Sequence, residues 1–345
     1  MILMFAVLAG AIGYGGVALG WALAPKLFGF GWLAALSVWI AWPLGAMALM
    51  LIHALTGGRW GKAAHHALAA GVRSVFLIPL FVIPYALTAH RLYPWLQAGA
   101  AQVDNALYLN GPAFVLRGVI YLLIWLVLAV LVTRAAENAN ELARLAPPAL
   151  ILLALTTTFA AIDAIMSLEP TFASSIFGLV QISEIGALSL SIAALALLFS
   201  SAPDPEALRQ LARLLLAFVI LWSYLAFMQL LIVWQSDLPH EAAWYLPRWR
   251  QGWRVIGGLI VLTHFVAPFF TLLSSAAQRS RRAVGFAAAS IIAGGILDQF
   301  WLVAPFAGAN SGMIALLTLS ALVAMACTSL LVARGRKQIS NWIEA

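Results

Sequence analysis

Long apolar stretches, separated by short charged or Pro/Gly-rich breaks, make up most of the chain. Ala113–Val132 and Ile314–Val332 are two of them, each about 20 residues long, which is the length of an α-helix that crosses ~30 Å of hydrocarbon. They do not show the strict apolar–polar alternation of a barrel strand. The pattern therefore predicts an all-α integral membrane protein with about ten spans. The predicted spans are residues 2–24, 28–55, 73–89, 113–133, 148–167, 173–200, 211–235, 253–276, 284–306 and 313–333.

Two longer breaks suggest how the spans are grouped. His90–Pro112 and Ser236–Gly252 lie four spans apart, and each is followed by a helix that opens with an arginine, Arg117 or Arg254. An offset of four helices preserves direction, as in parallel repeats related by an axis along the membrane normal. We therefore expect a single polytopic domain over residues 1–345. It would contain one four-helix bundle at 28–167 and a second at 173–306, with two flanking helices.

Composition and charge narrow the function classes. The chain is 64 % hydrophobic and only 9 % charged, which excludes a soluble globular protein. A single cysteine, Cys327, allows no intrachain disulfide, no thiolate-held iron–sulfur cluster and no covalent haem attachment. The formal charge of +7 comes from loop arginines and indicates orientation and contact with lipids rather than binding of nucleic acid.

The positive residues are distributed unequally between the two sides. Thirteen of the 19 Lys and Arg residues fall on the side of the two termini, which predicts cytoplasmic termini. These thirteen are Arg59, Lys62, Arg73, Arg134, Arg144, Arg209, Arg213, Arg279, Arg281, Arg282, Arg334, Arg336 and Lys337.

Several polar residues are predicted to lie at membrane depth, where an ionised side chain costs at least ~2.5–3.5 kcal/mol. Glu184 and His264 each lie about 11 residues, roughly 16 Å, from the outer ends of their spans and hence near the midplane. Asp163 and Asp298 are expected in the outer third, with Arg117 at a similar depth. These residues are the candidates for chemistry inside the membrane.

Two interpretations of these residues remain open. Fixed ion pairs of Arg117 with an acid would only hold helices together, although Glu184 has no obvious cationic partner at its depth. Alternatively, carboxylates and a histidine bridged by water accept and release protons when burial favours their neutral forms. In the second interpretation Glu184 is the proton-carrying group at the membrane midplane. The predicted proton pathway comprises Asp163, Glu184, His264, Asp298 and Tyr224.

Haem, metal and catalytic sites are not expected. Among the histidines only His264 lies deep, so no pair at one depth is available to hold a b-type haem. The acids are too isolated to ligate a metal ion.

Two stretches resemble a known family. Phe159-Ala-Ala-Ile-Asp-Ala-Ile-Met-Ser-Leu-Glu-Pro170, continuing to Ser175-Ile-Phe-Gly178, resembles F-D-W-x-M-S-L-E-P-x-W-x-S-T-I-F-G of the ActF-type membrane subunit of alternative complex III, a bacterial quinol:cytochrome c oxidoreductase. Phe227 to Tyr245, with His264-Phe-Val-Ala-Pro-Phe-Phe-Thr271, is similar to that family's F-x-Q-x-L-I-W-x-x-x-x-P-E-E-x-x-W-Y and G-H-F-x-x-P-F motifs. The chain departs from the pattern at Ala164, at residues 171–173 and at His240.

The resemblance implies an NrfD-like (polysulfide-reductase membrane-subunit) fold in a bacterial inner membrane, and a subunit that holds no redox cofactor and conducts protons. It implies as partners a homologous NrfD-like membrane subunit, a periplasmic iron–sulfur subunit and cytochrome c subunits, which carry the iron–sulfur clusters and haem c. Asp163, Glu169 and His264 match motif positions. Glu184, Asp298 and Arg117 are assigned from burial alone.

Two surfaces are predicted for ligands and partners. If quinone or quinol binds this chain, we expect it near the outer ends of the third to fifth spans, around His90, Tyr93, Arg117 and Asp163. The loop Ser236–Gly252 mixes charges with aromatic residues, as interface cores do, and is expected to dock a periplasmic redox subunit. Its predicted contact residues are Asp237, Glu241, Trp244, Arg248 and Arg250.

Two other functional classes fit part of the pattern. A secondary transporter would use a parallel repeat and a midplane carboxylate equally well, although no pair of Gly/Pro-broken spans stands in corresponding positions. A structural membrane anchor of a redox complex would have all its acids paired. The family resemblance favours the subunit of a quinol-oxidising complex.

Overall fold

The computed structural model describes residues 2–97, 105–199, 204–250, 252–308 and 310–343, and these residues are helical with no β-strand. The α-helices are α1 (Ile2–Leu23), α2 (Pro25–Thr56), α3 (Arg59–Ser74), α4 (Ile78–Leu92), α5 (Gly111–Ala135), α6 (Ala139–Ala164), α7 (Phe177–Leu198), α8 (Pro205–Ser236), α9 (Pro239–Tyr245), α10 (Trp253–Ile260), α11 (Ala267–Leu273), α12 (Arg281–Val303) and α13 (Ser311–Ile343). The shorter helices are η1 (Val75–Leu77), η2 (Pro94–Leu96), η3 (Met166–Leu168), η4 (Leu246–Trp249), η5 (Val261–Val266), η6 (Ala277–Arg279) and η7 (Ala304–Ala307).

Ten helical segments in this part of the chain are long and apolar enough to cross a membrane, so the protein is a multi-pass membrane protein and the predicted number of spans is confirmed. Two of these spans join several elements. The third runs from α3 through η1 to α4, and the eighth runs from α10 through η5 to α11. The third span therefore begins at Arg59, well before the predicted residue 73.

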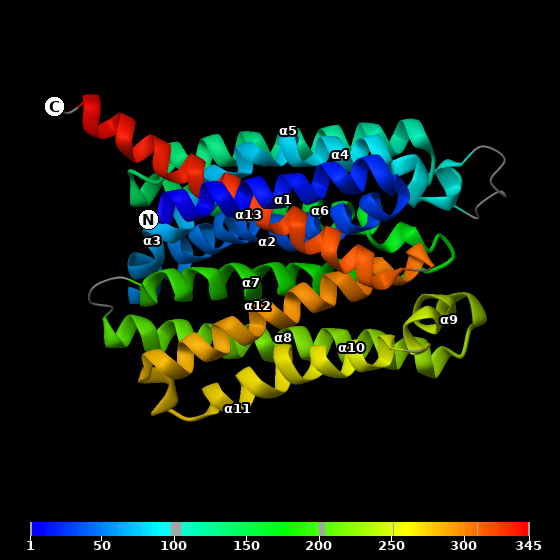
Figure 1. Ribbon diagram of the computed structural model, residues 1–345. Helices are drawn as coiled ribbons and strands as arrows, with labels where there is room; N and C mark the ends of the chain where they lie inside the picture. The colour runs from blue at the N-terminus through cyan, green and yellow to red at the C-terminus, as the bar shows by residue number, and fades with distance from the viewer. Residues whose placement is uncertain (1, 98–104, 200–203, 251, 309, 344–345) are drawn as a thin grey trace.

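The spans lie side by side in one bundle (Figure 1). Helix α1 begins and α13 ends at the same end of the bundle, whereas α9 caps the opposite end. We call these the termini end and the α9 end. The side of the membrane that each end faces remains a prediction from the distribution of charge.

Helix α2 is the central element. It packs against α3, α4 and α6, and also against α7, α12 and α13, while α1 packs mainly on α13. Helix α7 in turn packs against α8 and α12. The flanking positions of α1 and α13 fit the expected arrangement, and the division into bundles at 28–167 and 173–306 stays a prediction because α2 contacts helices of both halves.

The first turn of α5, which precedes Arg117 and Tyr121, has two features that stabilise the start of a helix. The side chain of Asn110 accepts a hydrogen bond from the backbone N–H of Ala113 at 2.9 Å, and Pro112 occupies the first turn of α5. Both features stabilise a helix start because they satisfy or remove N–H groups that lack an intrahelical partner. The cap fixes the start of α5 and thereby the positions of Arg117 and Tyr121 along it.

The eighth span is interrupted by a π-helix, η5, at Val261–Val266. Pro268, one turn further on, has no N–H to donate to the carbonyl of His264. A wider turn is a common response to such a missing bond, and π-turns are frequent at functional sites. The sequence therefore places a local irregularity of the backbone at His264.

Candidate functional site

The structure brings together Glu184 of α7 and His264 of η5. The Oε2 atom of Glu184 lies 2.9 Å from Nε2 of His264. The two side chains are 1 % and 0 % exposed, so this is a buried acid–histidine pair. No cationic partner was expected for Glu184, although His264 was placed at a similar depth. The structure puts His264 beside it, and the π-turn that sets the direction of the imidazole cannot be read from hydropathy.

The other imidazole nitrogen restricts the proton arrangement of the pair. Nδ1 of His264 lies 3.0 Å from the backbone carbonyl oxygen of Ile291. A carbonyl oxygen only accepts hydrogen bonds, so Nδ1 carries a proton and donates it. Neutral imidazole then presents a bare Nε2 to Glu184. One proton between Nε2 and Oε2, on either atom, leaves the pair neutral overall.

Two glycines of α12 make the space that the pair occupies. A Cβ atom on Gly294 would lie 2.5 Å from Cβ of His264 and 2.8 Å from its backbone, and a Cβ on Gly295 would lie 2.4 Å from Oε1 of Glu184. Any larger side chain at these positions would collide with the pair. These small residues therefore let α12 approach both members of the pair closely.

Asp298 and two glutamines extend the polar cluster toward the α9 end. Asp298 follows Gly294 by four residues and therefore lies one helical turn beyond it on the same face of α12. Nε2 of Gln299 donates to Oδ2 of Asp298 at 3.4 Å and to Oε1 of Gln181 at 3.2 Å. All three side chains are at most 6 % exposed, so the cluster is enclosed between α7 and α12.

Several buried polar atoms of this cluster have no hydrogen-bond partner among the residues that the structure describes. They are Nε2 of Gln181, both carboxylate oxygens of Glu184, Nε2 of His264, Oε1 of Gln299 and Nε1 of Trp222, whose ring centroid lies 4.3 Å from that of His264. The Glu184–His264 contact is therefore at ion-pair distance but outside hydrogen-bond geometry. An unsatisfied buried polar atom costs about 1–3 kcal/mol, so such atoms are usually paired with water or a ligand. The cluster therefore has capacity to bind water molecules.

Glu184 lies closer to the α9 end than expected. Helix α7 begins at Phe177 rather than at residue 173, because residues 169–176 form a turn that contains Pro170. Glu184 is thus the eighth residue of a 22-residue helix.

Asp163 forms a separate charged group with Arg117. Nε and Nη2 of Arg117 donate to the two carboxylate oxygens of Asp163 at 2.9 and 2.8 Å, and the Tyr121 hydroxyl donates to the same carboxylate at 2.9 Å. The guanidinium also lies 3.8 Å above the ring of Tyr108. A two-pronged pair of this kind fixes the orientation of both side chains. The fixed ion pair that the sequence left open is present.

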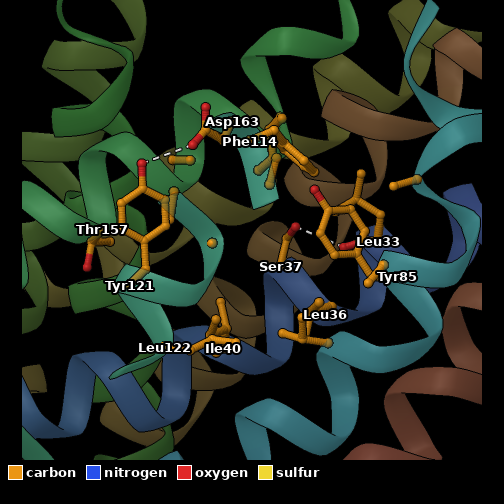
Figure 2. Close-up of a pocket in the computed structure, with 18 of the residues that line it drawn as sticks. Leu33, Leu36, Ser37, Ile40, Tyr85, Phe114, Tyr121, Leu122, Thr157 and Asp163 are labelled. Atoms are coloured by element: carbon orange, nitrogen blue, oxygen red, sulfur yellow. Dashed lines mark hydrogen bonds between the residues drawn. The ribbon is translucent and has the colours of Figure 1, made fainter. Parts of the chain in front are cut away.

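A cavity of about 560 Å³ adjoins this ion pair. We call it the α5 cavity, because α5 forms much of its wall, with α2, α4 and α6 around the rest. Figure 2 shows Asp163, Tyr121, Tyr85 and Phe114 around it. The cavity reaches the outer surface of α5, where its lining residues Val115 and Val119 are exposed.

The predicted quinone residues are placed unequally around the α5 cavity. His90 and Asp163 line it. Tyr93 is fully buried outside the lining and donates its hydroxyl to the carbonyl of Ala164 at 2.8 Å. The hydroxyl of Tyr85, which does line the cavity, lies 2.6 Å from that of Tyr93. Tyr85 rather than Tyr93 therefore lines the α5 cavity, and quinone contact there stays a prediction.

Tyr224, expected on the proton route, lies on the outer face of α8. Its side chain is 55 % exposed, and no hydrogen bond joins its hydroxyl to the acid–histidine pair in the described chain. Trp222, two residues earlier, turns to the opposite face and packs on His264. Helical spacing alone could have placed Trp222 and Tyr224 on different faces but could not decide which face is inward.

The loop predicted to dock a partner folds back on the protein. Trp244 and Arg248 are 0 % and 1 % exposed, so neither is available for contact with another chain, and this part of the prediction is wrong. Asp237 and Arg250 are exposed, and Glu241 is half-buried. Residue 251 of this loop and residues 98–104 of the other long loop lie outside the described residues.

Arg248 anchors the loop to the end of α12. Its guanidinium donates to the backbone carbonyls of Trp301 at 3.1 Å, Leu302 at 2.6 Å and Trp244, and it lies 4.0 Å above the Trp244 ring. Burial lowers the pKa of Arg248. The three carbonyls and the aromatic ring compensate its charge in the protein interior.

Comparisons with known proteins give no family for the chain. No protein-family model matches it, and no curated protein matches it.

Proposed function

We propose that this membrane protein conducts protons through the Glu184–His264 pair, as a subunit of a quinol-oxidising respiratory complex of the alternative complex III type. The buried 2.9 Å contact between Oε2 of Glu184 and Nε2 of His264 carries the proposal. Proposed with it are a bacterial inner membrane, cytoplasmic termini and the redox partners that the motif resemblance implies.

The pair has the chemistry that a proton relay needs. A proton shared between a carboxylate and an imidazole costs little to move, because the pair stays neutral whichever atom holds it. Gain of a proton leaves a neutral acid beside an imidazolium, and loss leaves a carboxylate beside neutral imidazole. Each change creates one net charge, which water at the unpartnered atoms of Gln181, Glu184 and Gln299 would stabilise.

Asp298 supplies the next station toward the α9 end. It lies one turn beyond the glycines that contact the pair and, unlike Asp163, has no arginine or lysine partner among the described ion pairs. The route therefore runs from the pair to Asp298. Asp163, held by Arg117, is a positioning group of the α5 cavity rather than a station.

Proton flux into liposomes tests this function. The purified protein, with whatever subunits accompany it, is reconstituted with a trapped pH-sensitive dye, and a potassium gradient with valinomycin drives proton entry. Glu184→Gln keeps the size of the side chain but cannot release a proton, and we expect it to reduce flux at least tenfold. Glu137→Gln makes the same change at an exposed residue between α5 and α6 and should leave the flux unchanged. Equal flux in both variants would contradict the proposal.

Purification from native membranes distinguishes the proposed function, a subunit of a complex, from a secondary transporter and from a structural anchor. A subunit should come out with iron–sulfur and haem c partners, whereas a transporter should be stable alone. A structural anchor would keep its partners, and Glu184→Gln would then impair assembly rather than proton flux.

A second function, contact with quinone, is favoured by the α5 cavity. The cavity is apolar except for a few polar groups, as ligand sites usually are, and the hydroxyl of Thr157 in its wall has no partner within the described ranges. Thr157→Val removes that hydroxyl and should weaken binding of a quinone analogue about fivefold, the value of one hydrogen bond. Thr133→Val, on the exposed side of α5, is the control.

A further inference from the structure

A second cavity, of about 720 Å³, lies between α7, α8, α10, η5 and α12. We call it the α8 cavity. Its lining is almost entirely apolar and aromatic, and it is bounded by the π-helix η5, whose Val261 and Phe265 face it. It is therefore a second space beside the acid–histidine pair, and it shares Gln181 and Asp298 with the proposed proton route.

Three buried polar residues stand in its wall. Asp298, Gln181 and Trp222 are 6 %, 4 % and 5 % exposed, and all three line the cavity. Nε2 of Gln181 and Nε1 of Trp222 are N–H donors without a hydrogen-bond partner in the described chain. Two unused donors in an apolar cavity favour a ligand that brings acceptor oxygens and little other polarity.

The cavity reaches the outer surface of the spans. Its lining includes Ile220, Tyr224 and Phe227 of α8, which are 46 %, 55 % and 57 % exposed, and Val261 of η5, which is 53 % exposed. In a multi-pass protein this outer surface faces lipid, so a ligand enters from the membrane between α8 and η5. The ligand must therefore be lipid-soluble.

The α8 cavity differs from the α5 cavity in its carboxyl group. In the α5 cavity the carboxylate of Asp163 is neutralised by two hydrogen bonds from Arg117. In the α8 cavity, Asp298 accepts one long hydrogen bond from Gln299, and the described residues provide no ion pair for it. Gln181 lines both cavities and separates them. The two cavities thus share a wall, but among the described residues only the α5 cavity contains a carboxylate that is paired with a positive charge.

We propose that the α8 cavity binds a quinone-class molecule. The Gln181 amide and the Trp222 indole donate to a ring carbonyl of this ligand, and its apolar tail leaves between α8 and η5. Asp298 lines the same cavity, so its carboxyl group lies beside the bound ring. Binding therefore links occupancy of this cavity to the protonation of the group next to the acid–histidine pair.

Photolabelling of the purified protein with an azido-quinone, followed by peptide mapping, tests this site. We expect labelled peptides from α8 and η5 that excess unlabelled short-chain quinone protects. Trp222→Phe removes the indole N–H but keeps an aromatic ring, and it should lower this labelling about fivefold. Trp125→Phe makes the same change in the wall of the α5 cavity and should not affect it.

Two adjacent glycines provide a second comparison that keeps the test decisive if Trp222→Phe fails to fold. Gly257 lines the α8 cavity, and a Cβ there would meet nothing closer than 3.7 Å, so Gly257→Leu fits and fills the space. Gly258 is exposed, and a Cβ on it would meet nothing within 4 Å, so Gly258→Leu is the matched control. Gly257→Leu should abolish the α8 labelling, and Gly258→Leu should preserve it.

Two outcomes would overturn the site. One is labelling confined to α4 and α5. The other is α8 labelling that Gly257→Leu leaves unchanged, or that a bilayer phospholipid displaces as well as quinone does, because the cavity would then hold only annular lipid. Binding is measured without electron or proton transfer. Failure of this inference therefore leaves the proton route intact, and loss of flux in Glu184→Gln does not affect the labelling.

Discussion

At the scale of single residues, Asp163 and Glu184 are both buried carboxylates with a basic partner, but the two partners differ in whether they exchange a proton. Asp163 faces a guanidinium, which remains charged, and accepts three hydrogen bonds from Arg117 and Tyr121. Glu184 faces an imidazole, which gains and loses a proton near neutral pH. The first pair is suited to fixing structure and the second to moving a proton.

The Arg117–Asp163 pair is expected to contribute to stability. Arg117→Leu leaves a buried carboxylate without its counter-charge, and we expect it to lower the free energy of unfolding in detergent by about 3 kcal/mol, the lower end of the range for a broken buried pair. The double variant Arg117→Leu/Asp163→Leu should recover most of the loss. Thermal unfolding followed by circular dichroism measures both. If the single variant is as stable as wild type, the pair has no structural role.

At the scale of elements, the π-helix η5 determines where His264 points. A regular α-helix over Val261–Val266 would rotate the imidazole relative to α7. One residue more or fewer in a helical turn changes the direction in which the following side chains point by about 100°. The close packing of Gly294 on the backbone of His264 holds the widened turn in place. The acid–histidine contact therefore depends on an irregular element.

Replacing Pro268 tests this dependence. Pro268→Ala restores an N–H that can donate to the carbonyl of His264, so we expect the turn to become α-helical and the imidazole to leave Glu184. Proton flux should fall at least tenfold while thermal stability stays equal to or above that of wild type, because a backbone hydrogen bond is gained. Pro84→Ala, in the interior of α4, is the control and should retain its flux. Normal flux in Pro268→Ala would show that the π-turn is dispensable.

At the scale of the whole molecule, the ten spans were predictable because each is a long apolar stretch bounded by charges or helix-breaking residues. The partnership of Arg117 with an acid was also foreseeable from depth alone. Depth also placed Glu184 and His264 together near the midplane, but the contact between their side chains was not foreseeable, since it depends on the late start of α7 and on the π-turn. The burial of Trp244 and Arg248 was not predicted, because a loop of aromatic and charged residues has the same sequence pattern whether it anchors in lipid headgroups or packs on the end of α12.

The orientation of the bundle can be checked with the single native cysteine. Cys327 is buried, so a cysteine introduced at the exposed Trp249, near α9, can be labelled selectively. We expect a membrane-impermeant maleimide to label Trp249→Cys in intact cells. A fluorescent protein that folds only in the cytoplasm should be bright when fused after residue 345. Labelling of Trp249→Cys only after cell lysis would reverse the predicted orientation.

The most direct test of the central claim, that Glu184 and His264 act as one proton-carrying unit, is a double-mutant comparison of proton flux. Glu184→Gln and His264→Gln are measured singly and together in the same liposomes. If one proton is shared between the two side chains, each single variant loses the flux, and the double variant is no worse than either. Full flux in His264→Gln, or losses that add in the double variant, would contradict the account.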